Sequence, residues 1–155
     1  MKIKIVYRVL MFTAMLFILS CEKEDVSQRP MSQADIWDCY NNSEWSELKI
    51  RNELIGKWKW IYSESFWAPD KGWNTENENT LIEFTNDSTL NISVNGNSEK
   101  TTMWIVTPKD GELYGLELDS AISTLVYGRI LICGEILEFN NSYIDGIDNY
   151  FKRIE

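Results

Sequence analysis

The sequence predicts an all-β domain of eight antiparallel strands, with a short helical segment before them. From Gly56 onward, apolar and polar residues alternate with a period of two, the pattern of strands that bury one face. Turn residues separate these runs, and Asn95-Gly96 is a strong two-residue hairpin signal. The runs are short and most connections are brief. The chain therefore suits either a closed up-and-down barrel or a two-sheet sandwich.

Residues 1–20 have the features of a secretory leader and are set apart from the fold. Three cations lie within the first eight residues, and residues 9–19 form an apolar run that is too short for a membrane-spanning anchor. Ser20 and Cys21 end this run in a pattern that resembles a bacterial lipobox. Cleavage there would leave Cys21 as a lipidated N-terminus. An ordinary signal peptide with a chance cysteine is the alternative.

Residues 21–33 are expected to form a lipidated tether. Acyl chains on Cys21 would hold the chain at the membrane, since each buried CH₂ contributes about 0.8 kcal/mol. The acidic cluster at residues 22–25 resembles the surface-export signals of some lipoproteins, although a solvated tether explains it equally well. We therefore expect the protein at the outer membrane, on the cell surface or the periplasmic face, with membrane contact through the N-terminal lipid only.

The remaining residues, 34–155, are predicted to form one domain whose barrel strands begin near residue 55. Ser32 to Asp35 resembles a capping-box start for a short amphipathic helix. Residues 41–43 break it, and a second helical stretch is expected over 44–53.

Eight strands follow in order. In the first, which starts at Gly56, Trp58, Trp60 and Tyr62 share one face and are expected to point inward. In the others, inward apolar residues alternate with outward polar ones, with turn residues between. Their predicted ranges are 81–85, 90–94, 98–107, 113–118, 125–133, 136–140 and 149–154.

Charge and composition exclude several functional classes. Without residues 1–20, 12 Lys and Arg stand against 24 Asp and Glu, a formal charge of −12. Phosphate would repel so acidic a chain, and no basic stripe offsets that repulsion, so nucleic acid is not an expected partner.

The chain contains no histidine. This rules out nucleophile systems that depend on a histidine base, as well as imidazole metal sites. Carboxylates could still act as acid and base, but no spacing picks out a pair. We expect no catalytic residue, no metal and no cofactor, and hence a protein that is not an enzyme.

Gly56, Trp58 and Arg153 carry a resemblance to the lipocalin-like domains of bacterial lipoproteins. In such proteins, the Trp of a Gly-x-Trp lies across the closed end of an eight-stranded up-and-down barrel, and an Arg of the last strand packs over its ring. The resemblance covers roughly residues 44–155 and favours the barrel over the sandwich. The chain departs from well-known lipocalins at residues 133–135, which replace their Thr-Asp-Tyr-type turn motif. Receptor docking through that loop is therefore not implied.

In this barrel, strand direction alternates, so the sixth strand returns to the closed end and brings Cys133 near the entry segment that holds Cys39. Once Cys21 is lipidated, these are the two remaining thiols in an oxidising compartment. A Cys39–Cys133 disulfide is predicted. Two buried free cysteines are the alternative.

The same topology places the longest loop, residues 63–79, at the open end. We expect a small apolar or amphipathic ligand, or the apolar face of a sugar, to bind there. The candidate ligand-binding residues are aromatic: Trp60, Tyr62, Phe66, Trp67, Trp73, Phe84 and Tyr143. Alternatively, side chains fill the barrel and it acts through protein contact, as an inhibitor or an accessory subunit of an envelope complex.

Overall fold

The computed structural model describes residues 31–65, 67 and 77–155. The predicted leader, most of the tether with Cys21, and the loop residues Phe66 and Trp73 lie outside the described residues. Two helices precede the strands, α2 (Gln33–Asn41) and α3 (Glu47–Leu54). The strands are β1 (Gly56–Ser65), β2 (Thr80–Phe84), β3 (Thr89–Val94), β4 (Asn97–Pro108), β5 (Tyr114–Leu118), β6 (Arg129–Cys133), β7 (Ile136–Asn140) and β8 (Ile147–Arg153).

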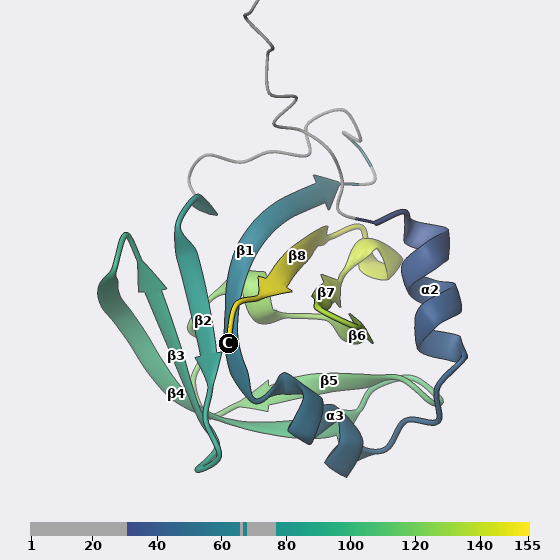
Figure 1. Cartoon of the computed structure of the whole chain (residues 1–155), viewed down its shortest axis with the longest axis horizontal. Coiled ribbons are helices and arrows are strands. Elements are labelled where there is room, and N and C mark those ends of the chain that lie inside the picture. Colours follow the sequence, from purple (N-terminus) through teal and green to yellow (C-terminus); the bar gives the residue numbers. More distant parts are fainter. Residues whose placement is uncertain (1–30, 66, 68–76) are drawn as a thin grey trace, which may run out of the picture.

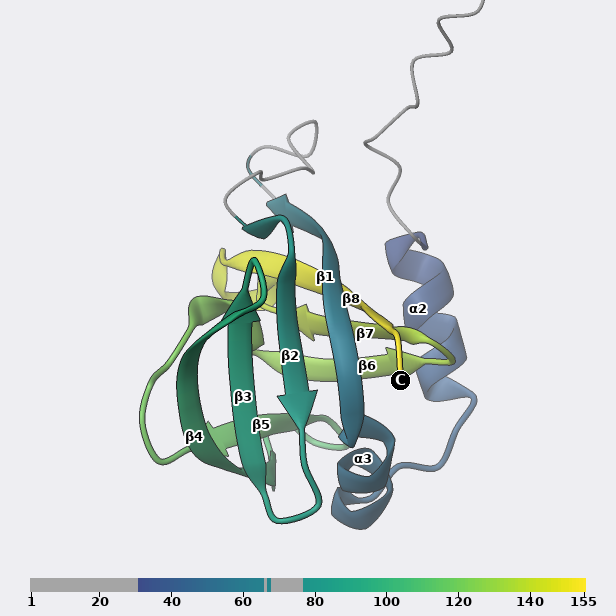
Figure 2. The ribbon, with the colours of Figure 1, turned by 60° about the vertical axis from the view of Figure 1, so that its left-hand side comes forward.

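The eight strands form one closed antiparallel barrel in sequence order, in which β8 pairs with β1. This confirms the predicted all-β, up-and-down barrel and excludes the two-sheet sandwich. Helix α2 lies along the outside of the barrel near β6, and α3 lies under the end at which β1 begins (Figures 1 and 2). No helix in the described part of the chain is long and apolar enough to cross a bilayer.

Local sequence signals explain where the helices and one hairpin form. The Ser32 hydroxyl accepts a hydrogen bond from the Asp35 amide at 3.1 Å, and Ser46 caps α3 in the same way. Asn95 and Gly96 both have positive φ, as a two-residue turn between β3 and β4 requires. The predicted sixth strand is shorter than expected, because Thr124–Val126 forms a 3₁₀ turn before it.

Strand β1 contains a bulge that turns its last residues over. Trp60 pairs with Phe151, whereas Tyr62 pairs with Tyr150, so the register shifts by one residue between them. One extra residue in a strand reverses which side chains face the interior. Tyr62 therefore lies on the outer face with Tyr150, their ring centroids 5.7 Å apart, and the prediction that Tyr62 lines the barrel depth is wrong. Ser63 takes the inward position instead.

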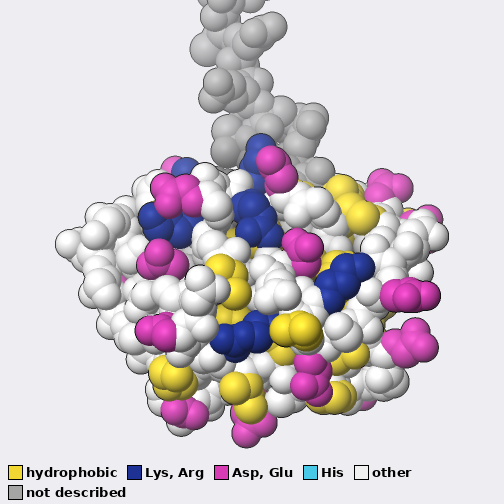
Figure 3. All heavy atoms as spheres, turned by 60° about the horizontal axis from the view of Figure 1, so that its bottom comes forward, with side chains coloured by type: hydrophobic (Ala, Val, Ile, Leu, Met, Phe, Trp, Pro, Cys, Tyr) yellow, Lys and Arg dark blue, Asp and Glu magenta, His cyan; other side chains and the backbone are white. Residues whose placement is uncertain are grey.

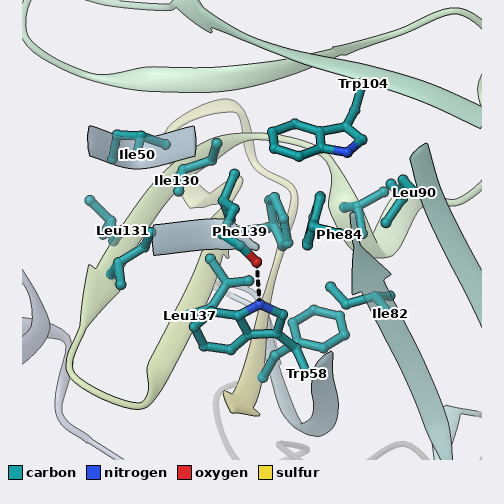
Figure 4. Packing of buried hydrophobic residues seen from close by; sticks show 14 of the residues in the cluster. Ile50, Trp58, Ile82, Phe84, Leu90, Trp104, Ile130, Leu131, Leu137 and Phe139 are labelled. Atoms are coloured by element: carbon teal, nitrogen blue, oxygen red, sulfur yellow. Dashed lines mark hydrogen bonds between the residues drawn. The ribbon is translucent and has the colours of Figure 1, made fainter. Parts of the chain in front are cut away.

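The interior of the barrel is filled with side chains. Phe84 packs edge-on against Trp104 at 5.0 Å between ring centroids, and Phe139 packs likewise against Phe151 at 5.9 Å. Figure 4 shows how closely such residues interdigitate. The largest are at most 1% exposed: Trp58, Trp60, Phe84, Trp104, Phe139 and Phe151. An eight-stranded barrel is just wide enough for such filling.

Trp58 and Arg153 meet at the closed end, where α3 covers the barrel. The Arg153 guanidinium carbon lies 4.1 Å from the centroid of the Trp58 ring. The Trp58 indole donates to the Leu54 carbonyl at 2.8 Å (Figure 4). Arg153 donates to the carbonyls of Ile55, at 3.0 Å, and Glu53. One side chain thus ties the last strand to the first and satisfies carbonyls at the end of a helix.

Gly56 allows this close approach. Its φ is +127°, and a Cβ there would lie 2.5 Å from the Glu155 carbonyl oxygen. A larger residue at this position would therefore push the C-terminus away from β1.

A disulfide joins Cys39 of α2 to Cys133 at the end of β6, with a Cα–Cα distance of 5.7 Å. This confirms the predicted pairing. The bond fixes α2 against the barrel wall across a sequence separation of 94 residues.

Replacing both Cys39 and Cys133 with alanine is expected to lower the free energy of unfolding. Releasing so long a loop costs on the order of 4 kcal/mol in the chain-entropy model. Urea unfolding of the double variant, beside the oxidised wild type and the wild type under reductant, measures the difference. Equal midpoints for oxidised and reduced wild type would contradict the stabilising role.

Replacing Arg153 with methionine is expected to cost about 2–3 kcal/mol of unfolding free energy, since it removes the stacking on Trp58 and leaves two carbonyls unpaired. Lys152→Met is the matched control, because Lys152 is exposed and pairs with Glu135 only at 3.8 Å. Denaturant unfolding of both variants measures the costs. The stated role of Arg153 fails if the two substitutions cost the same.

Candidate functional site

A hollow of about 510 Å³ lies at the open end of the barrel, opposite the Arg153 closure. Strands β1 and β8 form one side, the β5–β6 and β7–β8 connections form most of the rest, and Asn77 of the β1–β2 connection also contributes. Its lining residues are Ser63, Asn77, Ser123, Thr124, Leu125, Tyr127, Asn141, Ile144, Gly146, Ile147 and Asn149. None of these described residues is charged.

Two buried carboxamides contribute to the hollow. Asn149, 3% exposed, accepts from the Trp60 indole and donates to the Ile147 carbonyl, both at 3.3 Å. Asn141, 5% exposed, donates to the carbonyls of Tyr127, at 2.6 Å, and Ile147, at 3.4 Å. Its Oδ1 is buried and has no hydrogen-bond partner among the described residues. This oxygen lies against Gly128, where a Cβ would come within 2.6 Å of it, and Gly128 does not line the hollow.

The rim of the hollow is apolar. Tyr127, Ile144 and Ile147 line it and are each about half exposed. Trp67, just beyond the end of β1, is 70% exposed. An amphipathic arrangement results, with polar groups in the hollow and apolar side chains at its edge.

The predicted ligand-binding residues do not form one site. Trp60 and Phe84 belong to the packed core, and Tyr62 lies on the outer face. Trp67 is exposed, and Tyr143 packs on Arg129, whose guanidinium carbon lies 3.7 Å from the Tyr143 ring centroid. The part of the barrel interior that was predicted to bind a ligand is therefore a packed core, and the hollow lies above it.

Helix α2 covers a second polar region, on the outer face of the barrel. Glu138 of β7 is fully buried there, and its Oε1 accepts from Gln33 at 3.1 Å and from Asn140 at 2.9 Å. The Tyr150 hydroxyl donates to Gln33 at 3.0 Å. Burial, with the carboxylate of Asp148 nearby, raises the pKa of Glu138 to about 7 against the effect of these hydrogen bonds.

Two further hollows are less suited to a ligand. One of about 470 Å³ lies beside this buried region and includes Arg129, which is paired with Asp110. The other, of about 950 Å³, lies between the α2–α3 linker and the β4–β5 turn. Its aromatic ring Trp45 already stacks on Tyr40 at 4.9 Å and lies under the Lys49 ammonium.

The surface seen in Figure 3 offers no large apolar face. Apolar side chains there form small patches, and charged side chains of both signs separate them. Within the described ranges, no three Cys, Asp or Glu side chains are arranged to hold a metal ion. Of the regions above, the open-end hollow best combines space, buried polar groups and an apolar rim.

The sequence placed the ligand site at the open end of the barrel but did not single out the residues that form the floor of the hollow. Asn149 could have been found from its alternation with the inward Phe151 of the same strand. Asn141 and Ser63 could not, because the first lies in a connection and the second faces inward only because of the bulge.

We expect the buried Glu138 to make the protein less stable as the pH rises from about 4.5 to about 7. The folded chain holds this proton up to about pH 7, whereas the unfolded carboxyl, with a pKa of 4.5, has already lost it. The loss is on the order of 3 kcal/mol and levels off at higher pH. Urea unfolding of Glu138→Gln across this range should show a correspondingly flatter curve than wild type.

Glu117→Gln is the control for this measurement, since Glu117 is exposed. Its unfolding curve should keep the pH dependence of the wild type. A Glu138→Gln curve that runs parallel to the wild type would show that Glu138 does not titrate in this way.

Comparison with protein-family models, with curated proteins and with solved structures finds no match for this chain. The barrel is thus described by its own strand order, and the resemblance to lipocalin-like proteins rests on Gly56, Trp58 and Arg153.

Proposed function

We propose that the protein is a lipid-anchored envelope lipoprotein whose lipocalin-like barrel binds a small amphipathic ligand at its mouth. The observation that carries this proposal is the hollow of about 510 Å³ above a filled core. Its volume lies within the range of small-molecule sites, which are typically concave and combine apolar walls with a few polar groups. The ligand would rest on the core rather than enter it.

The lipobox-like sequence at Ser20 and Cys21 supports the anchor. Cys21 precedes Met31 by ten residues, a length that spans at most about 35 Å. Gln33, which begins α2, lines the hollow of about 470 Å³ together with Glu64, which lies near the open end of β1. The mouth therefore lies within a few tens of ångströms of the anchor, where amphipathic molecules of a membrane are at hand.

The arrangement of the mouth suits a ligand with two unlike ends. Asn141 and Asn149 place carboxamide groups low in the hollow, and Ile144 and Ile147 place apolar surface at its rim. We propose binding alone, with no chemical step.

A second candidate function is protein contact through the rim, as an inhibitor or an accessory subunit. The filled interior favours it, because a packed barrel is a rigid scaffold. So do the exposed Tyr127, Ile144 and Ile147, since exposed apolar groups near one another often mark contact sites.

Native mass spectrometry of the full chain, purified from its own envelope, tests the ligand proposal. We expect the wild type to retain a small molecule and Ile147→Glu to lose it, because the new carboxylate lies in the hollow. Ile105→Glu is the matched control: Ile105 is 51% exposed on β4, close to the 53% of Ile147, and does not line the hollow. A wild type that is always bare would contradict ligand binding. A protein retained by wild type but lost by Ile147→Glu would favour the second candidate.

A further inference from the structure

Resting on the proposed ligand site at the mouth, we propose that the ligand presents an uncharged, hydroxyl-bearing head group to the floor of the hollow. A sugar or the head of a glycolipid has this chemistry. The juxtaposition that leads to it is a set of buried, uncharged hydrogen-bonding groups beneath an apolar rim.

The described lining of the hollow is uncharged. A quarter of the chain is charged, yet no described residue that lines the hollow carries a charge. Lys109 lies near the rim, but its ammonium is held over the Tyr127 ring, 5.1 Å from the centroid, and it does not line the hollow. A carboxylate, phosphate or ammonium at the floor would lose water and gain no counter-ion from the described lining residues, which is strongly unfavourable.

The floor of the hollow carries uncharged polar groups. Asn141 and Asn149 contribute uncharged carboxamides, whose amide nitrogens donate to backbone carbonyls. Ser63 and Ser123 add hydroxyl groups, and the Ser123 oxygen accepts from the Leu125 amide, so its own proton remains available to a ligand.

The rim of the hollow is apolar. Ile144 and Ile147 are half exposed beside the polar floor, and they offer apolar surface to the rest of the ligand. Burial of apolar groups there would add affinity without adding a charge. The floor therefore selects the head group, and the rim accepts either a sugar face or an alkyl chain.

Titration calorimetry with three probes that share an eight-carbon tail tests this inference. The probes are octyl β-D-glucoside, octanoate and octylamine, each below its micelle concentration. We expect octyl glucoside to bind at least about tenfold more tightly than either charged probe, because one poorly matched buried group costs about 1.4 kcal/mol or more. Equal or tighter binding of octanoate or octylamine would overturn the inference. Methyl glucoside lacks the tail. If it binds as tightly as octyl glucoside, the ligand is a free sugar, and if it binds more weakly, the ligand is the head of a glycolipid. Both results support a hydroxyl-bearing head group.

Two variants locate the binding. Ser63→Ala removes one floor hydroxyl and is expected to weaken octyl glucoside about five- to tenfold, the effect of one hydrogen bond. Ser93→Ala, on β3 and away from the hollow, is the control and should bind as the wild type does. Equal affinities for the two variants would overturn the assignment of the floor.

The outcomes separate this inference from the proposed function. If a charged probe binds as tightly as octyl glucoside, and Ile147→Glu but not Ile105→Glu weakens it, the mouth site stands and the head-group assignment falls. If no probe binds the wild type, the mouth site and the inference both fall.

Discussion

The stacking of Arg153 on Trp58 is the contact on which the rest of the structure depends. It joins the last strand to the first, and its hydrogen bonds to Glu53 and Ile55 place α3 under the same end of the barrel. A planar guanidinium can stack on an indole and donate to two carbonyls at once, which a lysine ammonium cannot do with the same geometry. With this end closed, any opening must lie at the other end.

The filled core then decides where a ligand can go. Trp60 closes the space from below, since its indole donates to Asn149 at the base of the hollow. Above this level, the bulge in β1 turns Ser63 inward and sends Tyr62 outward against Tyr150. Large aromatic side chains thus give way to small polar ones within one strand. At that level, the packed core of the barrel ends and the hollow begins.

Much of the fold could be predicted from the sequence, because strand period, turn residues and helix caps are local signals. The Cys39–Cys133 disulfide followed from strand direction in the up-and-down barrel, once Cys21 was assigned to lipidation. Other features depend on contacts between distant segments. The bulge is defined by pairing with β8, and Glu138 reads as an outward, solvated residue until α2 covers it. The sequence alternation also suggested that the barrel interior binds a ligand, because inward aromatic residues give the same sequence pattern in a cavity and in a packed core.

The most direct test of this account is a set of amide and indole NMR spectra recorded while octyl glucoside is added to the folded domain. We expect shifts confined to the open-end hollow, at Ser63, Thr124, Asn141 and Ile147, with the Trp104 indole unchanged because it lies in the filled core. Shifts of the Trp104 indole, without unfolding, would show that the ligand enters the barrel depth and would contradict the account.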